Sequence, residues 1–240
     1  GGDGNDYIFA ISSSGDNVLT GGAGNDWLDS SESTGNNSLS GGEGDDSLFT
    51  KNSSAGSSNS LDGGNGNDYL SIGLGNTVVS GGAGLDVLQG DFSNATSGIV
   101  MSLTVSSTSG LLVANDGTAT FTDIEQFDLT GSAFDDVLLG GNDRDTLYTG
   151  STGNDLLSGG AGVDVLYAYG SSGNSTLIGG LGDDALSAYV STGNNTLQGE
   201  DGADFLTAEW SSGNNTLSGG VGDDTLTAHS STGNNYLDGG

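Results

Sequence analysis

The sequence predicts an all-β fold, a parallel β-solenoid built from coils of about 20 residues. The first observation is a nine-residue template, Gly-Gly-x-Gly-x-Asp-x-(Leu/Ile/Val)-x, which recurs along most of the chain. The second is that 47 of the 240 residues are glycine and none is proline, which would remove a backbone N–H from a stacked ladder. The third is that the apolar residues stand as single leucines rather than in runs, which argues against a globular core. The acidic residues are numerous but periodic, and this indicates an ordered repeat rather than disorder.

Two kinds of half-turn make up each expected coil. The Asp-type template begins at residues 1, 21, 41, 63 and 81, and again at 140, 159, 179, 199 and 219. Partners with the same spacing lie at 12–20, 32–40, 190–198, 210–218 and 230–238, and weaker relatives begin at 54, 72 and 170. We expect each half-turn to be a six-residue glycine-rich bend, in which glycine permits a positive φ, followed by a short strand.

The expected core is narrow. Side chains alternate along a strand, so the residue in eighth place of the Asp-type template should point inward. That column is Ile8, Leu28, Leu48, Leu70, Leu88, Leu147, Leu166, Leu186, Leu206 and Leu226. Two extra residues follow the Asp-type strands, and alternation also points inward their alanines, Ala168, Ala188, Ala208 and Ala228. We therefore expect the sheet of Asp-type strands to be the longer one, with Tyr167, Tyr169, Tyr189 and Phe205 on its outer face.

One segment interrupts the period. Residues 90–130 contain alternating, strand-like runs but no glycine template. We interpret this segment as a β-rich insertion between two solenoid blocks, 1–89 and 131–240. A structural elbow is the favoured role, and a separate function inside the insertion is left open.

Charge and composition exclude several classes of function. Only 2 residues are Lys or Arg against 32 Asp or Glu, and the net charge of −30 excludes nucleic-acid binding through phosphates and disfavours an anionic membrane surface. No apolar stretch approaches the roughly 20 residues that span a bilayer, and no N-terminal secretion signal is visible. The chain has no cysteine, one histidine and no lone buried acid pair, and its carboxylates are periodic, so we do not expect an enzyme.

The periodic aspartates predict calcium binding. Calcium takes six to eight hard oxygens, and a glycine bend can turn backbone carbonyls toward one point while the sixth-place Asp adds carboxylate oxygens. Stacking brings the bend of the next coil one strand spacing away, about 4.8 Å, so that two bends can share an ion. One column of sixth-place residues is Asp6, Asp26, Asp46, Asp68 and Asp86, and the other is Asp145, Asp164, Asp184, Asp204 and Asp224. The expected carbonyl ligands belong to Gly22, Gly24, Gly42, Gly44, Gly64, Gly66, Gly82, Gly84, Gly160, Gly162, Gly180, Gly182, Gly202, Gly220 and Gly222.

On the opposite edge the sixth place is mostly neutral. It is aspartate only at Asp136 and Asp155, which belong to neighbouring coils. If each ion needs two stacked bends, we expect about four ions in each Asp column and one between Asp136 and Asp155. Without calcium the columns of carboxylates would repel one another, so we expect the chain to fold on calcium binding.

The repeated nonapeptide resembles the calcium-binding repeat of RTX proteins, the hemolysin-type secreted proteins of Gram-negative bacteria. The resemblance covers nearly all of the chain outside residues 90–130, and the stretch DIEQFDLTGSAFDDVLLGG at 123–141 resembles one common upstream of such repeats. It implies a β-roll fold, folding driven by calcium, type I secretion and an extracellular or cell-surface location.

The neutral edge has two interpretations. Asn and Thr can close bends through hydrogen bonds to their own backbone, and stacked amides can form ladders, so this edge would need no ion. Alternatively it is a ligand face, formed by Thr152, Thr192, Thr232, Asn194, Asn214 and Asn234. This array resembles the rows of an ice-binding RTX adhesin region, although there the bend that meets ice carries aspartate and calcium.

We interpret the chain as a calcium-binding structural region of a larger secreted or surface protein, such as an adhesin stalk, a surface-layer or sheath component, or a filament. Alternatives are an ice-binding solenoid and a non-catalytic module of a secreted enzyme. Because Gly1-Gly2 and Gly239-Gly240 both stand in repeat register, we expect further repeats beyond the ends. Calcium, neighbouring repeats or copies of the chain, and a surface glycan or ice are the expected partners.

Overall fold

The computed structural model describes residues 1–53, 56–104 and 107–240, and these form strands, turns and bends without a helix among them. The fold is a parallel β-solenoid of about 12 turns with coils of about 20 residues, as predicted. The chain divides into two compact units, unit 1 (1–92 with 102–128) and unit 2 (93–101 with 129–240). The half-turn predicted to begin at residue 54 starts outside the described residues. Residues 105–106 of the expected insertion also lie outside them. None of the described residues forms a helix that is long and apolar enough to cross a membrane.

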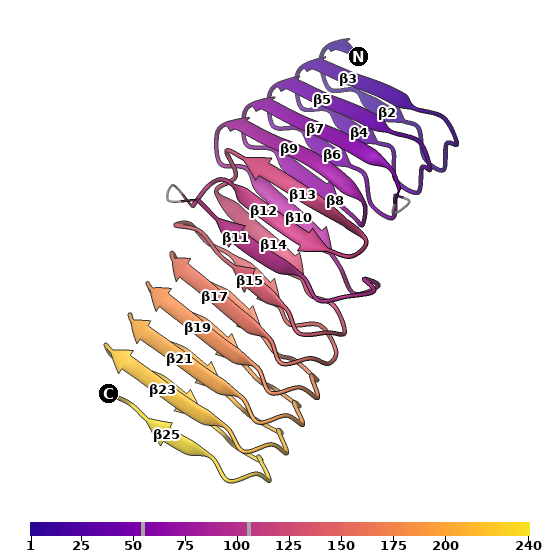
Figure 1. Cartoon of the computed structure of the whole chain (residues 1–240). Coiled ribbons are helices and arrows are strands. Elements are labelled where there is room, and N and C mark those ends of the chain that lie inside the picture. The colour runs from indigo at the N-terminus through magenta and orange to yellow at the C-terminus, as the bar shows by residue number, and fades with distance from the viewer. Residues whose placement is uncertain (54–55, 105–106) are drawn as a thin grey trace. The chain divides into compact units, whose positions relative to one another are not determined.

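Unit 1 consists of two stacked sheets (Figure 1). One runs in the order β1 (Gly2–Asp3), β3 (Asn17–Ala23), β5 (Asn37–Glu43), β7 (Ser58–Asn65), β9 (Asn76–Ala83), β13 (Gly117–Thr122) and β12 (Gly110–Ala114). The other runs β2 (Tyr7–Phe9), β4 (Trp27–Asp29), β6 (Ser47–Phe49), β8 (Tyr69–Ile72) and β10 (Val87–Asp91). Neighbouring strands are parallel except for β12 and β13, which form an antiparallel hairpin inside the expected insertion.

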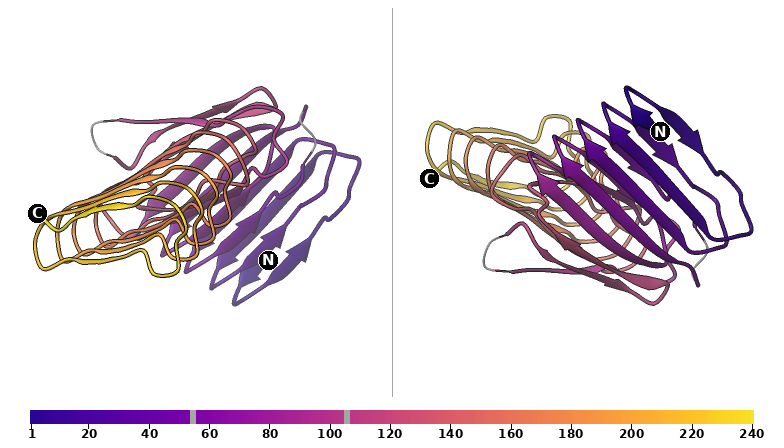
Figure 2. Two further views of the ribbon diagram at one scale, coloured as in Figure 1. Left: turned by 90° about the horizontal axis from the view of Figure 1, so that it is seen from below. Right: turned by 90° about the horizontal axis from the view of Figure 1, so that it is seen from above.

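Unit 2 repeats this arrangement. One sheet contains β15 (Val137–Leu139), β17 (Leu156–Ala161), β19 (Thr176–Leu181), β21 (Thr196–Asp201), β23 (Thr216–Val221) and β25 (Tyr236–Asp238). The other contains β16 (Thr146–Tyr148), β18 (Val165–Tyr167), β20 (Ala185–Ser187), β22 (Phe205–Thr207) and β24 (Thr225–Thr227). The chain passes from one unit to the other after Phe92, within β11 (Val100–Leu103) and within β14 (Gln126–Thr130). Viewed from below and above, the successive coils of unit 2 overlap as flattened loops (Figure 2).

The pairing register confirms the predicted core. Leu166 pairs with Leu186, which pairs with Leu206, so eighth-place residues stack directly on one another. The inner coils bury this column completely: Leu28, Leu48, Leu70, Leu88, Leu147, Leu166, Leu186 and Leu206 are all 0% exposed. Ala168, Ala188 and Ala208 are buried beside them. The core of each coil is therefore a few small and medium side chains thick.

The prediction that the Asp-type strands form the longer sheet is wrong. The Asp-type strand β20 has three residues, whereas β19 of the other sheet has six. The longer strands continue into the first glycines of the following Asp-type bend, where Gly160 still pairs with Gly180. The Asp-type strands end early because the chain turns into a left-handed conformation soon after the inward alanine, with φ of 59° at Val190. The aromatic residues do lie on the outer face, and Tyr148 stacks on Tyr167 at a ring-centroid distance of 5.0 Å.

Candidate metal centre

The Asp-type bends are shaped by glycine at second and fourth place. Gly180 and Gly182, for example, have φ of +118° and +120°, which is accessible to glycine and costly for other residues. A methyl group added to Gly182 would also collide with the carbonyl oxygen of Gly162 in the preceding coil. All the glycines predicted to supply carbonyl ligands share this positive φ. Their role as ligands stays a prediction.

The sixth-place aspartates form a continuous hydrogen-bonded ladder in each unit. The backbone N–H of Asp26 donates to Oδ1 of Asp46 at 2.7 Å, and the N–H of Asp46 donates to Oδ1 of Asp68 at 2.8 Å. In unit 2 the N–H of Asp164 donates to Oδ1 of Asp184 at 2.8 Å, and the same contact joins Asp184 to Asp204. One oxygen of each of these carboxylates thus accepts a hydrogen bond from a backbone N–H of the preceding coil.

The second carboxylate oxygen has no hydrogen-bond partner. Within the described residues, Oδ2 is buried and unpartnered at nine aspartates, namely Asp6, Asp26, Asp46, Asp68, Asp86, Asp164, Asp184, Asp204 and Asp224. Each lies close to the first-place glycine of its own bend. A methyl group on Gly179 would collide with Oδ2 of Asp184 and would lie 2.8 Å from the carbonyl oxygen of Gly199 in the next coil. Carboxylate and carbonyl oxygens therefore approach the same region from two stacked bends, without a donor between them.

Burial raises the pKa of six of these carboxyl groups above the ordinary 3.8, namely those of Asp46, Asp68, Asp86, Asp164, Asp184 and Asp204. The pKa reaches about 7 at Asp68 and Asp164 and about 6 at Asp86 and Asp184. Desolvation is the largest cause, the backbone N–H of the preceding coil lowers the pKa in part, and neighbouring acidic groups raise it further. A buried charge of this kind needs a counter-charge, and a cation would supply it.

These pKa values predict how the calcium-free chain responds to pH. Between 3.8 and about 7 the folded chain holds more protons at Asp68 and Asp164 than the unfolded chain does. By linkage, the free energy of unfolding then falls as the pH rises through this window. Metal-free protein should show more β structure by far-UV circular dichroism at pH 5 than at pH 8. Equal signals at both pH values, or the opposite trend, would contradict the raised pKa values.

The opposite edge of the coils provides an internal comparison. The N–H of Asn195 donates to Oδ1 of Asn215 at 3.1 Å, as the aspartates do on their own edge. The Nδ2 group of Asn195 then donates to the Ser191 hydroxyl at 2.9 Å, to the Gly193 carbonyl at 3.0 Å and to Asn215 Oδ1 at 3.1 Å. The amide group therefore satisfies the oxygens around it. At the corresponding atom of the aspartate edge, a carboxylate oxygen is left without a donor, and this is where a cation fits.

The chain also matches a known family of repeats. The model of the RTX calcium-binding nonapeptide repeat (4 copies) matches residues 11–32, 33–52, 55–79, 71–94, 128–151, 148–169, 167–189, 187–210 and 211–240. These matches cover most of the chain.

The chain belongs to the RTX calcium-binding repeat family.

A search of curated proteins finds no significant match. Among solved structures, the chain is similar to the extracellular lipase LipA from Serratia marcescens, with 16% sequence identity and a TM-score of 0.21. The comparison covers 92% of this RTX chain and 32% of the lipase, so the chain spans about a third of the length of that protein.

The donor set of the RTX bends fits a hard cation. Within the described part of the chain, no group of three or more His, Asp or Glu side chains gathers as a metal site. The oxygens that approach one another are instead one carboxylate from each bend and backbone carbonyls, which is an all-oxygen set of the kind that calcium prefers. The site residues predicted on the aspartate edge thus fit the ion that the family binds.

Three predicted ligands differ from the other nine. Oδ2 of Asp145 accepts a hydrogen bond from the N–H of Gly141 at 2.6 Å. Oδ2 of Asp136 accepts one from the N–H of Ser132 at 2.7 Å, and Oδ2 of Asp155 accepts one from the Ser175 hydroxyl at 3.3 Å. Asp136 and Asp155 are stacked as predicted, because the N–H of Asp136 donates to Oδ1 of Asp155 at 3.0 Å. Hydrogen bonds compete with an ion at these three positions.

The predicted ligand face is exposed but partly occupied by its own backbone. Thr152, Thr192, Thr232, Asn194, Asn214 and Asn234 are all exposed. Oδ1 of Asn194 accepts the N–H of Asn214, and Oδ1 of Asn214 accepts the N–H of Asn234, each at 2.7 Å. These fifth-place amides therefore form a second ladder outside the first. Ice binding through this edge stays a prediction.

The template missed one acidic residue that lies in the column. Glu125 Oε2 accepts the backbone N–H of Asp86 at 2.9 Å, in the way that the next aspartate would. Glu125 lies in the segment 123–141 that resembles the stretch upstream of RTX repeats, but no glycine template surrounds it. That stretch was the one signal in the sequence that pointed to this residue.

Proposed function

We propose that the chain is a structural region of a larger secreted protein, in which calcium ions along the aspartate edge hold the coils together. The observation that carries this proposal is the set of nine buried carboxylate oxygens that have no hydrogen-bond donor among the described residues. At the corresponding position of the opposite edge, Asn195 and Asn215 place an amide NH₂ group. When bound, calcium supplies positive charge and accepts several oxygen ligands at once.

The residues of the chain would supply the ligands and the shape of the bends. Asp46 and Asp68 on one pair of coils, and Asp184 and Asp204 on another, would each contribute a carboxylate to an ion between two bends. The second- and fourth-place glycines would give the bends the backbone shape that turns carbonyl groups inward. Because the ligands come from successive coils, binding would couple the folding of each coil to that of its neighbours.

A secreted location and a non-catalytic role belong to the same proposal. RTX repeats are typical of secreted proteins. The carboxylates of the described columns are regularly spaced and hydrogen-bonded to backbone, as structural ligands should be, rather than set apart as an acid–base pair. An adhesin stalk, a surface layer, a filament or the RTX module of a secreted enzyme would all use such a region in the same way.

The test is to count bound calcium. Equilibrium dialysis of metal-free protein against calcium should give about eight ions per chain, the number expected if each pair of stacked aspartate bends holds one. Magnesium at the same concentration should bind far less, because it demands a smaller octahedral site and keeps its water. Less than one calcium ion per chain at millimolar calcium, or equal binding of magnesium, would overturn the proposal.

A further inference from the structure

Residues Asp123–Glu125 occupy the position of an aspartate bend, although they lack its sequence. Strand β13 pairs in parallel with β9, with Phe121 opposite Val79 and Thr122 opposite Ser80. Continuing this register places Asp123 beside Gly81, which is the first place of the last aspartate bend in unit 1. The segment therefore starts where the next coil would start its own bend.

The segment also ends in register. The N–H of Gln126 donates to the carbonyl oxygen of Asp86 at 3.0 Å, as the N–H of Val87 donates to the carbonyl oxygen of Asp68 at 2.8 Å one coil earlier. Gln126 thus corresponds to the seventh place of the template and Glu125 to the sixth. Three residues, 123–125, span the distance that six residues span in the other coils.

The oxygens of this short segment replace those of a full bend. Glu125 Oε2 accepts the N–H of Asp86 at 2.9 Å, compared with 2.8 Å for the contact from the N–H of Asp68 to Asp86 Oδ1. A methyl group on Gly81 would collide with the carbonyl oxygen of Asp123, whereas one on Gly63 would lie 2.6 Å from the carbonyl oxygen of Gly81. Both the carboxylate and the first-place carbonyl are therefore supplied by residues outside the repeat.

A buried, unpartnered oxygen faces this arrangement. Asp86 is 0% exposed, and its Oδ2 has no hydrogen-bond partner. A methyl group on Gly81 would lie 2.6 Å from that oxygen as well as against the Asp123 carbonyl. The bend 81–86 thus has on its far side the same two kinds of oxygen that the other bends have.

We propose that Asp123–Glu125 is a shortened bend that completes one further calcium site with the bend 81–86. Glu125 provides a carboxylate and Asp123 provides a carbonyl oxygen. The carboxylate of Asp86 binds the same ion from the other bend. Glutamate suits this position because its extra methylene lengthens the side chain where the backbone is three residues shorter. This inference rests on the proposed function, since it assumes that the aspartate column binds calcium.

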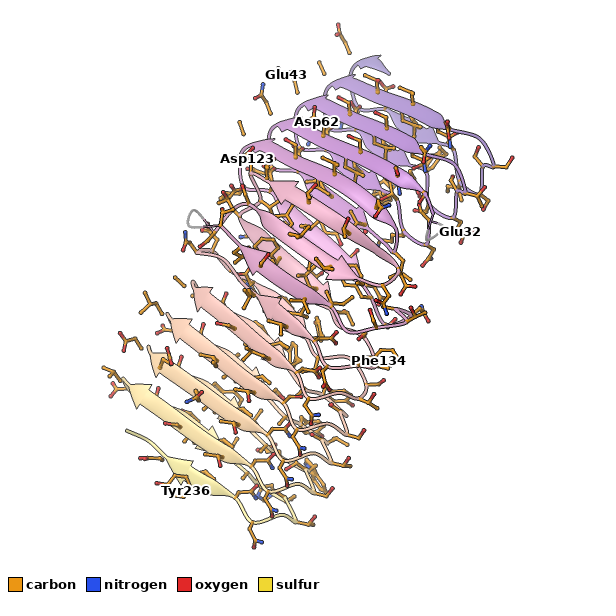
Figure 3. All side chains as sticks on the ribbon, in the orientation of Figure 1. Glu32, Glu43, Asp62, Asp123, Phe134 and Tyr236 are labelled. Atoms are coloured by element: carbon orange, nitrogen blue, oxygen red, sulfur yellow. The ribbon has the colours of Figure 1, made fainter. Side chains whose placement is uncertain are left out.

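The short segment is held firmly by unit 1. Ile124 is 0% exposed, and its N–H donates to the carbonyl oxygen of Thr108 at 2.9 Å. Asp123 has a φ of 55°, a left-handed conformation that aspartate tolerates better than most residues and that lets the chain turn within one step. Asp123 lies on the same edge of unit 1 as Glu43, and Glu32 lies on the opposite edge (Figure 3).

The test compares Glu125→Gln with Glu32→Gln. Both remove one negative charge, and glutamine at 125 can still accept the N–H of Asp86, so the ladder remains intact. Glu32 is exposed and contacts the Ser12 hydroxyl, away from the aspartate edge. Glu125→Gln should bind one calcium ion fewer per chain in equilibrium dialysis, and Glu32→Gln should bind the same number as the parent.

Hydrogen–deuterium exchange locates the loss. In the parent, calcium should slow exchange of the amides of residues 81–86 and 159–164. In Glu125→Gln, the protection of 81–86 should fall at least tenfold while that of 159–164 is unchanged. Glu125→Asp, which keeps the charge on a shorter side chain, should show an intermediate loss and serves if the glutamine variant does not fold. If both variants bind calcium like the parent, the inference is overturned. If the parent itself binds no calcium, the proposed function fails instead.

Discussion

Removing calcium should abolish the β structure of the chain. Neighbouring carboxylates in a column lie about one strand spacing apart, roughly 4.8 Å, and at an effective dielectric constant of about 20 each pair would repel by about 3 kcal/mol. A few such pairs equal the roughly 5–15 kcal/mol that stabilises a typical domain. The thin core of single leucines and alanines has little surplus burial to offset this repulsion. Far-UV circular dichroism of metal-free protein at pH 8 should therefore show a disordered chain, and calcium should restore the β spectrum.

Two controls make this result specific. Sodium chloride screens charge without binding the bends, so about 1 M salt should restore less of the β signal than millimolar calcium does. Magnesium should also restore less of the β signal than calcium does, because it demands a smaller octahedral site and keeps its water. A β spectrum that is unchanged by chelator at pH 8 would contradict the prediction and would mean that hydrogen bonds and the core suffice.

Exchanging three carboxylates for amides should make the folding of unit 2 much less dependent on calcium. In the triple variant Asp164→Asn, Asp184→Asn and Asp204→Asn, the new NH₂ groups can donate to the fourth-place carbonyl and to the side-chain oxygen of the next coil. Asn195 and Asn215 do this on the opposite edge. Each exchange also removes a buried charge, whose uncompensated burial costs about 3–5 kcal/mol. The variant should keep substantial β structure in chelator, and its calcium-induced rise in Tm should be less than half that of the parent.

A matched control separates the position of the charge from its loss. Asp183, Asp201 and Asp223 are exposed aspartates of the same coils but stand at third or fifth place. Changing these three to asparagine removes the same charge and leaves the sixth place intact, so this variant should still unfold in chelator. If both triple variants keep the same amount of β structure in chelator, net charge rather than the amide contact governs stability.

Much of the fold follows from periodicity alone. Leucine in eighth place and glycine in second and fourth place repeat every coil, so the inward column at Leu166 and Leu186 and the left-handed bends at Gly180 and Gly182 could be predicted. The neutral edge could also be anticipated, because Asn195 and Asn215 close their bends through side-chain hydrogen bonds as amides commonly do. The metal role of the aspartates follows from the same regularity and stays a prediction.

Features outside the repeat could not be predicted in this way. The length of each sheet depends on where the chain leaves the ladder, and the left-handed turn at Val190 is not encoded by a glycine or asparagine. Glu125 reaches the aspartate column from 39 residues away through the pairing of β13 with β9, which no local pattern reveals. The hydrogen bond from the Ser175 hydroxyl that occupies Asp155 likewise comes from the next coil rather than from its own bend.

The hydrogen-bonded ladder of aspartates keeps its spacing, whereas the number of residues between successive aspartates varies. The steps that join Asp26 to Asp46, Asp46 to Asp68 and Asp68 to Asp86 are 20, 22 and 18 residues long, yet the hydrogen bonds measure 2.7, 2.8 and 2.8 Å. A coil can therefore gain or lose residues without disturbing the edge that carries the charge. For a gene that grows by duplication, this means that imprecise copying is tolerated: a lineage can lengthen or shorten the array, and diversify one side of it, while the other side retains a constant pitch.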